Sequence, residues 1–496
     1  MTSRRIPPHA DPASAPPRRR VRVSFDGRTV EGYEGEPLAV TLLAADRPVL
    51  SRSFRFHRPR GLMCDTGQCG WCECEVDGRP SVRSCQVPVR DGLVAHSEHA
   101  WPTADRDLFG LLDVGSRLVP PTFYHHRFLR PRRLRKRYLD VIRRFGGRGR
   151  LPIDQPSDAR SRTARALDVD VLVVGGGNAG VAAAEDAAAS GSSVVLVEAV
   201  PGRARPRHPA IRFLDGATAV GWYEGVVTAI DDSSLWSIRA DRVVAATGTY
   251  EHLPSVRGID RPGVMGARRV VDLIRRHRVS PGQRALLVGQ AEDLEAADSA
   301  LRDTGAAVVV HVATGELRAV LGRRRVEGAV VVRPDGKRRV AVDLVVVGDR
   351  TPTLDLVLGA GARVESRDGV LVPLLDRDGR TTVPSLTVVG SSTGTASRVP
   401  PLAVHPRALV CFCEDVHVDE IRAQVGAGYG DPELVKRRTG ALTGPCQGKY
   451  CLQAFTAVLG ATARRDVATD GLPTARPPLR PIRLGDLVAV DDPADA

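Results

Sequence analysis

Residues 168–180 read Asp-Val-Asp-Val-Leu-Val-Val-Gly-Gly-Gly-Asn-Ala-Gly, an apolar run followed by closely spaced glycines. We expect a buried strand that ends at the first glycine and an Ala-rich helix over 181–190. In this pattern Gly175 makes the tight turn, Gly177 lets a pyrophosphate reach the helix N-terminus, and Gly180 allows helix and strand to pack closely. The sequence therefore predicts a dinucleotide-binding α/β unit, with a doubly wound fold that binds no ligand as the alternative.

A second strand, expected over 193–197, strengthens this interpretation. It ends at Glu198, eighteen residues beyond Gly180. A carboxylate at this distance can accept a hydrogen bond from the adenosine ribose. A glycine fingerprint alone is weak, but two strands, a helix and the acid together make the prediction specific.

Two later strands indicate which dinucleotide is bound. One runs into Thr247-Gly248 and the other into Gly390-Ser391. In flavoproteins with two dinucleotide-binding domains, these are the places where the chain returns to the FAD domain. We therefore expect FAD, bound more weakly than usual, because Ser391 is a neutral partner for the ribityl chain where an Asp is usual.

A second candidate nucleotide lobe has a degraded turn. Gly289 follows a strand, but Ala291 and Leu294 stand at the next two glycine positions. The methyl group would obstruct a pyrophosphate, the leucine would widen the packing of helix on strand, and the two acidic residues after Ala291 place negative charge near the phosphate. We predict no tight NADH or NADPH binding in this lobe.

The nine cysteines fall into two tight groups. The first opens as Cys64-x4-Cys69-x2-Cys72 and closes with Cys85, which is the plant-type spacing for a [2Fe–2S] cluster. A strand, a turn and a strand over 21–30 precede it, the usual opening of a β-grasp ferredoxin. We therefore predict a β-grasp domain that carries a [2Fe–2S] cluster.

Other roles for this first group stay open. A disulfide framework is unexpected in a large chain without a secretion signal. A structural zinc site is one alternative, and a Cys69–Cys72 dithiol is another, although that motif usually opens a helix and here a strand follows. In the iron–sulfur interpretation, Cys74 is the spare thiol.

The second group is Cys411-x-Cys413 followed by Cys446-x4-Cys451. Two short helices expected between the pairs would fold the chain back and bring the four thiols together. Cys446 lies in a loop that enters a helix expected over 452–459, whose N-terminal amides favour an anionic cluster. The spacing fits a second iron–sulfur centre, with zinc as the alternative.

Composition and charge exclude several classes of protein. The chain has 496 residues, 42% hydrophobic and 26% charged, as in globular proteins. Of the net charge of +13, residues 1–22 contribute +5 and residues 127–150 contribute +10. These segments are either solvated or dock an acidic partner or nucleic acid, and without a helix-turn-helix or finger pattern we predict no nucleic-acid binding. No apolar run suits a membrane span, and we predict a cytoplasmic protein.

Several further fragments of the sequence carry a resemblance to a known family. They are Phe-Arg-Phe-His-Arg-Pro-Arg-Gly over 54–61, Arg-Ser-Cys-Gln-Val-Pro-Val-Arg-Asp-Gly over 83–92, Arg-Pro-Gly-Val-Met over 261–265, Gly-Pro-Cys-Gln-Gly-Lys-Tyr-Cys over 444–451 and Arg-Pro-Pro-Leu-Arg-Pro over 476–481. In this order along the chain, they resemble the FAD-dependent subunits of heteromeric amine and amino-acid oxidising complexes. That family includes the alpha subunit of sarcosine oxidase, the A subunits of opine oxidases, multimeric proline and hydroxyproline dehydrogenases, and hydrogen cyanide synthase.

The resemblance implies an electron-transfer role beside a partner flavoprotein of the D-amino-acid-oxidase type, and a further small subunit is an additional partner. The flavoprotein partner would oxidise a carbon–nitrogen bond, as in sarcosine, proline, an opine or a D-amino acid. The resemblance assigns one [2Fe–2S] cluster to Cys64, Cys69, Cys72 and Cys85, a second to Cys411, Cys413, Cys446 and Cys451, and FAD to Gly175, Gly177, Gly180, Glu198, Thr247, Gly248, Gly390 and Ser391.

The predicted fold class is a multidomain α/β protein. It combines an N-terminal β-grasp ferredoxin-like domain, a central flavoprotein fold with two dinucleotide-binding domains, like that of glutathione reductase, and a small C-terminal helical [2Fe–2S] domain. The expected boundaries are a flexible basic arm over 1–19, the β-grasp domain over 20–100, a basic connector over 101–165, the FAD domain over 166–400 with its degenerate lobe over about 265–365, the helical domain over 405–465 and a Pro-rich tail over 466–496.

Two alternative functions remain at this point. One is a self-sufficient NAD(P)H-dependent FAD and iron–sulfur reductase, which the degraded second turn disfavours. The other is a scaffold that holds clusters without flavin, which Ser391 and a shortened excursion of 48 residues between Glu198 and Thr247 favour. No histidine has a nucleophile or acid at motif spacing, so we expect substrate chemistry on a partner.

Overall fold

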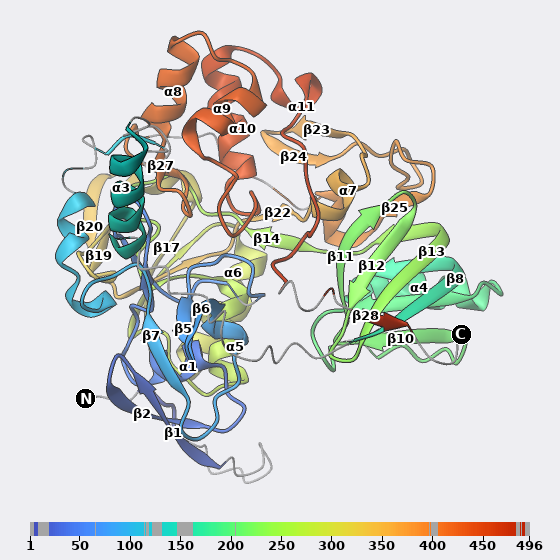
Figure 1. The fold of residues 1–496 in the computed structure, drawn as a ribbon, viewed down its shortest axis with the longest axis horizontal. Coiled ribbons are helices and arrows are strands. Elements are labelled where there is room, and N and C mark those ends of the chain that lie inside the picture. The colour runs from blue at the N-terminus through green and yellow to red at the C-terminus, as the bar shows by residue number, and fades with distance from the viewer. Residues whose placement is uncertain are drawn as a thin grey trace. The chain divides into compact units, whose positions relative to one another are not determined.

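The computed structural model of the protein contains two compact units, each built from three segments of the chain (Figure 1). The first unit comprises Met1–Asp154, Glu251–Asp349 and Pro400–Ala463, and the second comprises Gln155–Tyr250, Arg350–Val399 and Arg464–Ala496. The structure describes residues 4–7, 19–64, 66–113, 115, 119–121, 131–145, 162–203, 205–395, 397, 405–482, 487 and 489–491.

The N-terminal domain, residues 19–100, is a five-stranded sheet with one helix packed on it. Its first two strands form a hairpin through Asp26-Gly27, whose φ angles of 49° and 73° suit a two-residue turn. The first strand also pairs in parallel with the last one, and the helix is buried along its whole length. The sheet order is β2-β1-β7-β5-β6, with β1 (Arg20–Phe25), β2 (Arg28–Tyr33), β5 (Glu73–Val76), β6 (Arg79–Arg83), β7 (Val94–Ser97), helix α1 (Leu38–Ala44) and the short pair β3 (Ser51–Arg52) and β4 (Pro59–Arg60).

The second lobe, residues 251–349, has a parallel sheet in the order β15-β21-β16-β17 and an antiparallel meander. One face of its first helix carries Val270, Leu273 and Ile274, which are buried at helical spacing. The elements are β15 (Val264–Gly266), α5 (Ala267–Arg275), β16 (Arg284–Val288), α6 (Ala291–Asp303), β17 (Ala307–Val312), β18 (Leu317–Leu321), β19 (Gly328–Arg333), β20 (Gly336–Val340) and β21 (Leu344–Val347).

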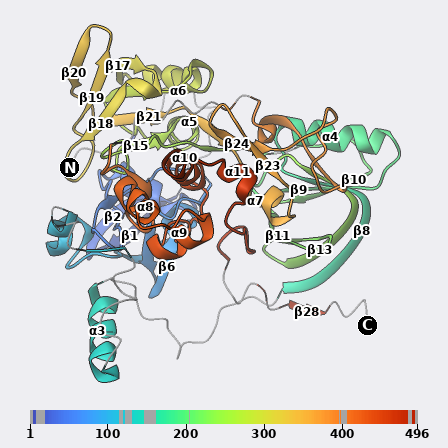
Figure 2. The ribbon, with the colours of Figure 1, turned by 90° about the horizontal axis from the view of Figure 1, so that it is seen from above.

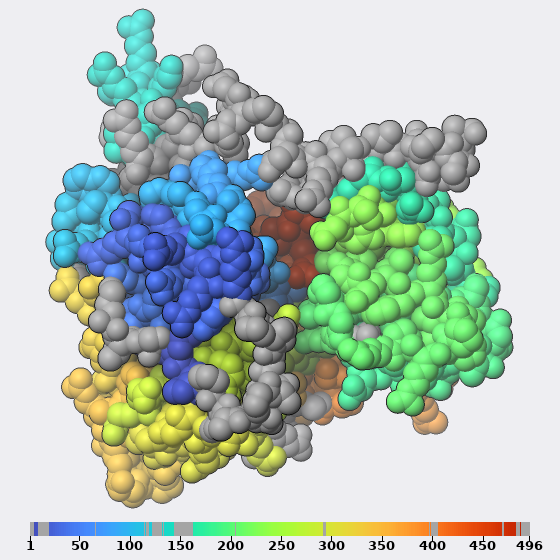
Figure 3. Space-filling view, turned by 90° about the horizontal axis from the view of Figure 1, so that it is seen from below, coloured from blue at the N-terminus to red at the C-terminus, as the bar shows by residue number. Residues whose placement is uncertain are grey.

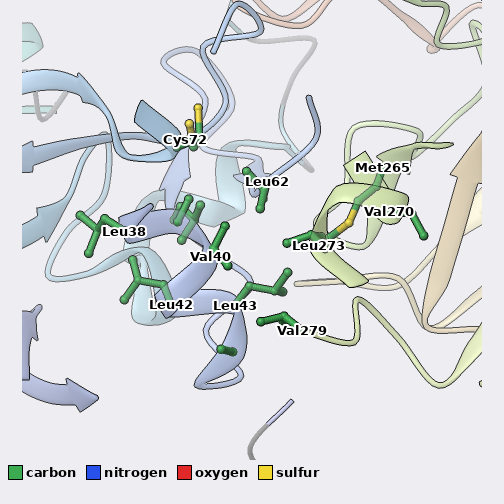
Figure 4. Packing of buried hydrophobic residues seen from close by; sticks show 14 of the residues in the cluster. Leu38, Val40, Leu42, Leu43, Leu62, Cys72, Met265, Val270, Leu273 and Val279 are labelled. Atoms are coloured by element: carbon green, nitrogen blue, oxygen red, sulfur yellow. The ribbon is translucent and has the colours of Figure 1, made fainter. Parts of the chain in front are cut away.

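The N-terminal domain and the second lobe share one hydrophobic core. Figure 4 shows Leu43 of α1 beside Val279, with Leu62 on the side of the core that faces Leu273 of α5. Their surfaces, blue and yellow in Figure 3, adjoin in that view. The second lobe, which we expected within the FAD domain and over about 265–365, therefore belongs to the first unit, because its apolar helix face packs against the N-terminal domain.

The C-terminal domain, residues 405–463, completes the first unit. Asp431 accepts a hydrogen bond from the Leu434 amide at 2.9 Å and begins one of its helices, which Gly440 ends at a φ of 76°. In Figure 2 its helices lie over the N-terminal domain. The elements are β26 (Leu409–Cys411), β27 (Val416–His417), α8 (Val418–Gly426), α9 (Pro432–Thr439) and α10 (Leu452–Ala463).

The second unit is built on a sheet in the order β10-β9-β8-β13-β12-β11, to which β25 adds in parallel beside β13. The strands are β8 (Arg162–Val174), β9 (Val194–Glu198), β10 (Ile211–Asp215), β11 (Thr218–Tyr223), β12 (Val226–Ile230), β13 (Ser234–Ala245), β14 (Thr249–Glu251), β22 (Arg350–Pro352), β23 (Val364–Arg367), β24 (Val370–Pro373), β25 (Leu386–Val388) and β28 (Ala489–Asp491). The helices are α4 (Asn178–Ala189), α7 (Asp355–Gly359) and α11 (Val467–Asp470).

The prediction of a multidomain α/β protein is confirmed, and the terminal segments differ from the expected boundaries. In the arm expected to be flexible, the described residues 4–7 are held, since Arg5 forms two bonds to Glu36 at 2.6 and 2.7 Å and the Ile6 amide donates to the Arg278 carbonyl. In the Pro-rich tail, the Leu479 amide donates to Val220 of β11 at 2.7 Å.

The basic connector contains helix α3 (Arg132–Phe145). Leu134 and Val141 in this helix are exposed, by 47% and 60%. The rest of the basic stretch, 127–130 and 146–150, lies outside the described residues. Within the part of the chain that the structure describes, we find no helix whose length and apolar character suit a membrane crossing.

Candidate cluster and dinucleotide sites

The structure brings together the four thiols of the first cysteine group. Cys64, Cys69 and Cys72 lie on the loop that leads into β5, and Cys85 lies on the turn after β6. All four are buried, with exposures of 1–6%. Two glycines of the loop adopt a φ of 72°, which residues with side chains rarely do. The fold therefore produces the convergence that the spacing predicted.

Within this group the thiols are hydrogen-bonded in pairs, Cys64 with Cys69 and Cys72 with Cys85. Burial is the largest cause that raises the pKa of the Cys69 thiol, and the hydrogen bond with Cys64 raises it further. The bond with Cys85 lowers the pKa of Cys72. Two adjacent pairs match a centre with two irons, each of which takes two thiolates.

Cys74, the fifth cysteine of the first group, lies outside this set of four thiols. Its thiol is fully buried and donates to the Leu50 carbonyl at 3.5 Å, and burial raises the pKa of the thiol. Cys74 lies on β5, two residues after Cys72, so a strand and not a helix follows the Cys69–Cys72 motif. The local structure is therefore not that of a dithiol motif at a helix start.

The four thiols of the second group also converge, at one end of the C-terminal domain. Cys446 accepts hydrogen bonds from Cys413 and Cys451, which lower the pKa of its thiol. Cys451 bonds to Cys411 as well, and this contact, the largest cause, raises the pKa of Cys451. Helices α8 and α9 fold the chain back between the two pairs, as the sequence indicated.

The chemistry of the four thiols in each group fits a metal centre. A [2Fe–2S] centre takes four thiolates, two on each iron, and the paired hydrogen bonds among the thiols fit that arrangement. A single zinc ion also takes four thiolates, around one point, so zinc stays the alternative for both groups.

The glycine turn of the second unit has the geometry of a dinucleotide site. A Cβ on Gly175, whose φ is 109°, would lie 2.3 Å from the Ala246 carbonyl oxygen. A Cβ on Gly180 would lie 1.8 Å from the Gly175 carbonyl oxygen, so both positions exclude side chains. A Cβ on Gly177 would meet nothing within 4 Å, which leaves open space at the N-terminus of α4 for a phosphate group.

Glu198 lies where the sequence placed it, at the end of β9, and is buried. Its two carboxylate oxygens accept hydrogen bonds from the Gly176 and Val200 amides, each at 2.7 Å. Each oxygen keeps a further lone pair for a ribose hydroxyl. The carboxylate is thus fixed by the turn itself and is oriented before any ligand binds.

The two return strands meet the same turn, but the residue that joins them is Ser392. A Cβ on Gly390 would lie 2.6 Å from Ala179 of α4, and the hydroxyl of buried Ser392 accepts from the Gly248 amide at 2.7 Å. Ser391 is exposed. Thr247 donates from its hydroxyl to the Thr353 carbonyl at 3.4 Å. The sequence pattern singled out Ser391 and missed Ser392, because only the structure shows which serine bonds to the Gly248 amide.

The degraded turn of the second lobe is well packed. Leu294 stands at the third glycine position and is buried, and it is accommodated because Gly348 faces it, where a Cβ would lie 2.7 Å from the leucine side chain. The larger separation between helix and strand that we expected from Leu294 is therefore not required. The carboxylate of buried Asp349 lies against Gly289, where a Cβ would be 2.8 Å from it. This second acidic feature further disfavours a phosphate there.

A buried ionic network is the feature that sequence reasoning missed. Arg58 donates to Asp260 through two nitrogens, each at 2.7 Å. Arg60 donates to Asp260 as well, and at 2.8 Å to Asp415. The network ties β4 of the N-terminal domain to the second lobe and to the C-terminal domain. Both arginines belong to the fragment 54–61. The high arginine content of that fragment was the sequence signal that could have indicated the network.

Comparison with known proteins relates these sites to a family. Residues 18–100 match the model of the 2Fe-2S iron-sulfur cluster binding domain, and residues 405–491 match the sarcosine oxidase A3 domain. The alpha subunit of sarcosine oxidase from Rhizobium meliloti (strain 1021) is 27% identical over 573 residues, which cover 94% of this chain and 57% of that protein. The chain is thus similar to sarcosine oxidase alpha subunits and opine oxidase A subunits. The resemblance predicted from the sequence is therefore confirmed.

A second relative is similar in sequence, and a solved structure has a similar fold. The A subunit of opine oxidase from Agrobacterium tumefaciens (strain Ach5) is 22% identical, and the match covers 66% of this chain and 93% of that one. The crystal structure of L-proline dehydrogenase from P. horikoshii superimposes with a TM-score of 0.71 at 19% identity, over 96% of this chain and 98% of that chain. The chain spans a little over half the length of the Rhizobium sarcosine oxidase chain that it matches.

Proposed function

We propose that this protein is the electron-transferring subunit of a heteromeric FAD- and iron–sulfur-dependent oxidoreductase that acts on CH–NH or CH–NH2 donors. A partner flavoprotein of the D-amino-acid-oxidase type would oxidise the carbon–nitrogen bond of sarcosine, proline, an opine or a D-amino acid. When bound, FAD supplies two-electron chemistry and the [2Fe–2S] clusters carry single electrons.

One observation carries the proposal: two groups of four thiols, all buried except the half-buried Cys413, gather in the first unit, and a complete glycine turn is present in the second. The turn at the N-terminus of α4 would hold the FAD pyrophosphate, and Glu198 would orient the adenosine ribose. Four cysteines would hold each cluster, namely Cys64, Cys69, Cys72 and Cys85 for the first, and Cys411, Cys413, Cys446 and Cys451 for the second.

The histidines of the first unit support a chain that relays electrons and leaves substrate chemistry to its partner. His57 is buried against Asp107 at 3.0 Å, and His417 is stacked on Phe56. Burial lowers the pKa of His252 to about 4, so this imidazole stays neutral at physiological pH. These side chains contribute to packing and are not positioned as a general base in a substrate pocket.

The first test is an anaerobic visible spectrum of the purified chain, with iron and flavin quantified on the same sample. We expect a flavin and iron–sulfur spectrum that dithionite bleaches and that NADH or NADPH leaves unchanged, because the turn at Gly289 is acidic and obstructed. Bleaching by either nucleotide would instead establish the self-sufficient reductase. Iron without flavin would establish the cluster-carrying scaffold.

The ligand assignment is tested by Cys446→Ser. We expect this variant to lose the iron of one cluster and to keep the iron of the other, because a serine hydroxyl is a poor ligand for iron in a thiolate site. The matched control is Cys74→Ser, which removes a buried thiol outside both sets of four and should keep both clusters. Full iron in the Cys446 variant, measured by a chelator assay, would refute the assignment.

A further inference from the structure

Two aromatic side chains, one from each cysteine loop, are in contact. Trp71 stands between Cys69 and Cys72, and Phe412 stands between Cys411 and Cys413. Their ring centroids are 5.4 Å apart, and the rings meet edge to face at 66°. Both side chains are buried, with exposures of 3% and 4%. The shortest covalent path from either ring to a cysteine therefore passes through one peptide unit.

Two arginines fasten the same loops to each other. The Arg60 guanidinium lies over the Trp71 ring, 5.4 Å from its centroid, and donates to the Phe412 carbonyl at 2.9 Å. Arg83 donates to the Gly67 carbonyl in the first loop and, at 3.0 Å, to the Pro445 carbonyl in the second. Each arginine thus binds both loops, which fixes the separation of the two thiol groups.

We propose that the Trp71–Phe412 contact is the route by which the two clusters exchange electrons, and that Arg60 and Arg83 are positioning residues that hold this contact closed. The inference rests on the proposed function, because it requires both cysteine groups to carry iron. In the exchange one electron leaves the reduced cluster, which becomes oxidised, and enters the oxidised cluster, which becomes reduced. No bond is formed or broken, and no proton needs to move.

The proposed electron exchange depends on an unbroken path of packed atoms between the two thiol groups. Electron tunnelling weakens steeply with distance and weakens further across gaps without atoms, and close packing removes such gaps. The pair is also shielded from water, and the loops that carry it are clamped by charge-assisted hydrogen bonds, which are stronger than neutral ones. The contact of one buried aromatic ring from each loop therefore gives a direct connection between the two groups.

The experiment compares Trp71→Leu and Phe412→Leu with Trp71→Phe, which keeps an aromatic ring, and with Trp101→Leu, which changes a Trp exposed by 58%. Each protein is mixed with less dithionite than its iron requires and frozen at increasing times. Electron paramagnetic resonance then gives the reduced fraction of each cluster. Cys446→Ser and Cys85→Ser provide the reference spectrum of each cluster alone.

We expect the two Leu variants to keep full iron and to reach the same final distribution of electrons as the wild type, but at least about tenfold more slowly, equivalent to about 1.4 kcal/mol of barrier. Trp71→Phe should largely restore the rate, and Trp101→Leu should not change it. Leu variants that retain iron and equilibrate as fast as the wild type would overturn the inference.

A second variant tests the inference if either Leu variant loses iron. Arg83→Met then replaces it in the measurement of electron exchange, because this substitution loosens the two loops without changing the rings. Slower exchange in Arg83→Met and recovery in Arg83→Lys support the inference, and unchanged exchange in both overturns it. A wild-type protein without iron would overturn the proposed function itself, and the inference with it.

Discussion

Asp260→Asn is expected to destabilise the first unit by about 3–5 kcal/mol, since it removes the buried carboxylate that two buried arginines share. The carboxylate is 1% exposed and lies between Arg58 and Arg60. Although burial alone would raise the pKa of Asp260, these two guanidinium groups lower it far below its ordinary value. Burial alone would lower the pKa of the Arg58 guanidinium, but the Asp260 carboxylate raises it by more.

The measurement is the midpoint of urea unfolding, followed by far-ultraviolet circular dichroism. The control is Asp298→Asn, which breaks an ion pair with Arg302 on the exposed surface of α6, where such a pair contributes about 0–1 kcal/mol. Both variants remove one carboxylate from the same lobe. If the Asp260 variant shifted the midpoint no more than the control does, the network would not be what joins the three domains.

Because of Asp260, we also expect the stability of the protein to depend on pH. The folded pKa of Asp260 is lowered, so its stabilisation is complete above the unfolded pKa of about 4 and is lost as the pH falls through the folded value. The difference in stability between the wild type and Asp260→Asn should therefore stay constant from neutral pH down to about pH 4, and it should shrink only in stronger acid. A difference that disappears between pH 7 and pH 5 would contradict this assignment.

Local patterns predicted local structure well. The glycine spacing of 175–180 and the cysteine spacing of 64–72 indicated turns whose geometry depends on a few neighbouring residues, and the structure shows those turns. Helices α8 and α9 were expected from short apolar periods, and both occur. The family followed from fragments in their order along the chain.

Features that depend on distant partners were not predicted. Arg60 meets Asp415 across 355 positions of sequence, and no period or spacing identifies such a pair. The placement of the second lobe failed for the same reason, because the apolar face of α5 shares a core with residues of the N-terminal domain more than two hundred positions earlier. Leu294 looked like a packing defect until Gly348, directly after β21, was seen to face it.

The glycine turn supplies the second large effect, and two neighbouring positions separate binding from folding. Gly180→Ala places a Cβ 1.8 Å from the Gly175 carbonyl oxygen and 3.0 Å from the Ala246 side chain. The turn and α4 must move apart, so we expect the second unit to lose about 1–3 kcal/mol of stability, the usual cost of overpacking. Bound flavin should be lost with it.

Gly177→Ala is the matched test, because the substitution is the same and the surroundings differ. Gly177 has an ordinary φ of −70° and would place its Cβ in open space. The protein without flavin should therefore unfold at the same temperature as the wild type. The new methyl group stands where the pyrophosphate would approach, so FAD should bind at least about tenfold more weakly, or about 1.4 kcal/mol.

Both variants are to be compared after flavin removal, because a bound ligand stabilises the folded state by itself. Thermal unfolding then reports on packing alone, and titration with FAD, followed by quenching of flavin fluorescence, reports on binding. Normal FAD affinity in Gly177→Ala would place the dinucleotide elsewhere, and normal stability in Gly180→Ala would mean that α4 tolerates a wider turn. The expected split, with binding lost in both variants and stability lost in one, would identify the N-terminus of α4 as the FAD site.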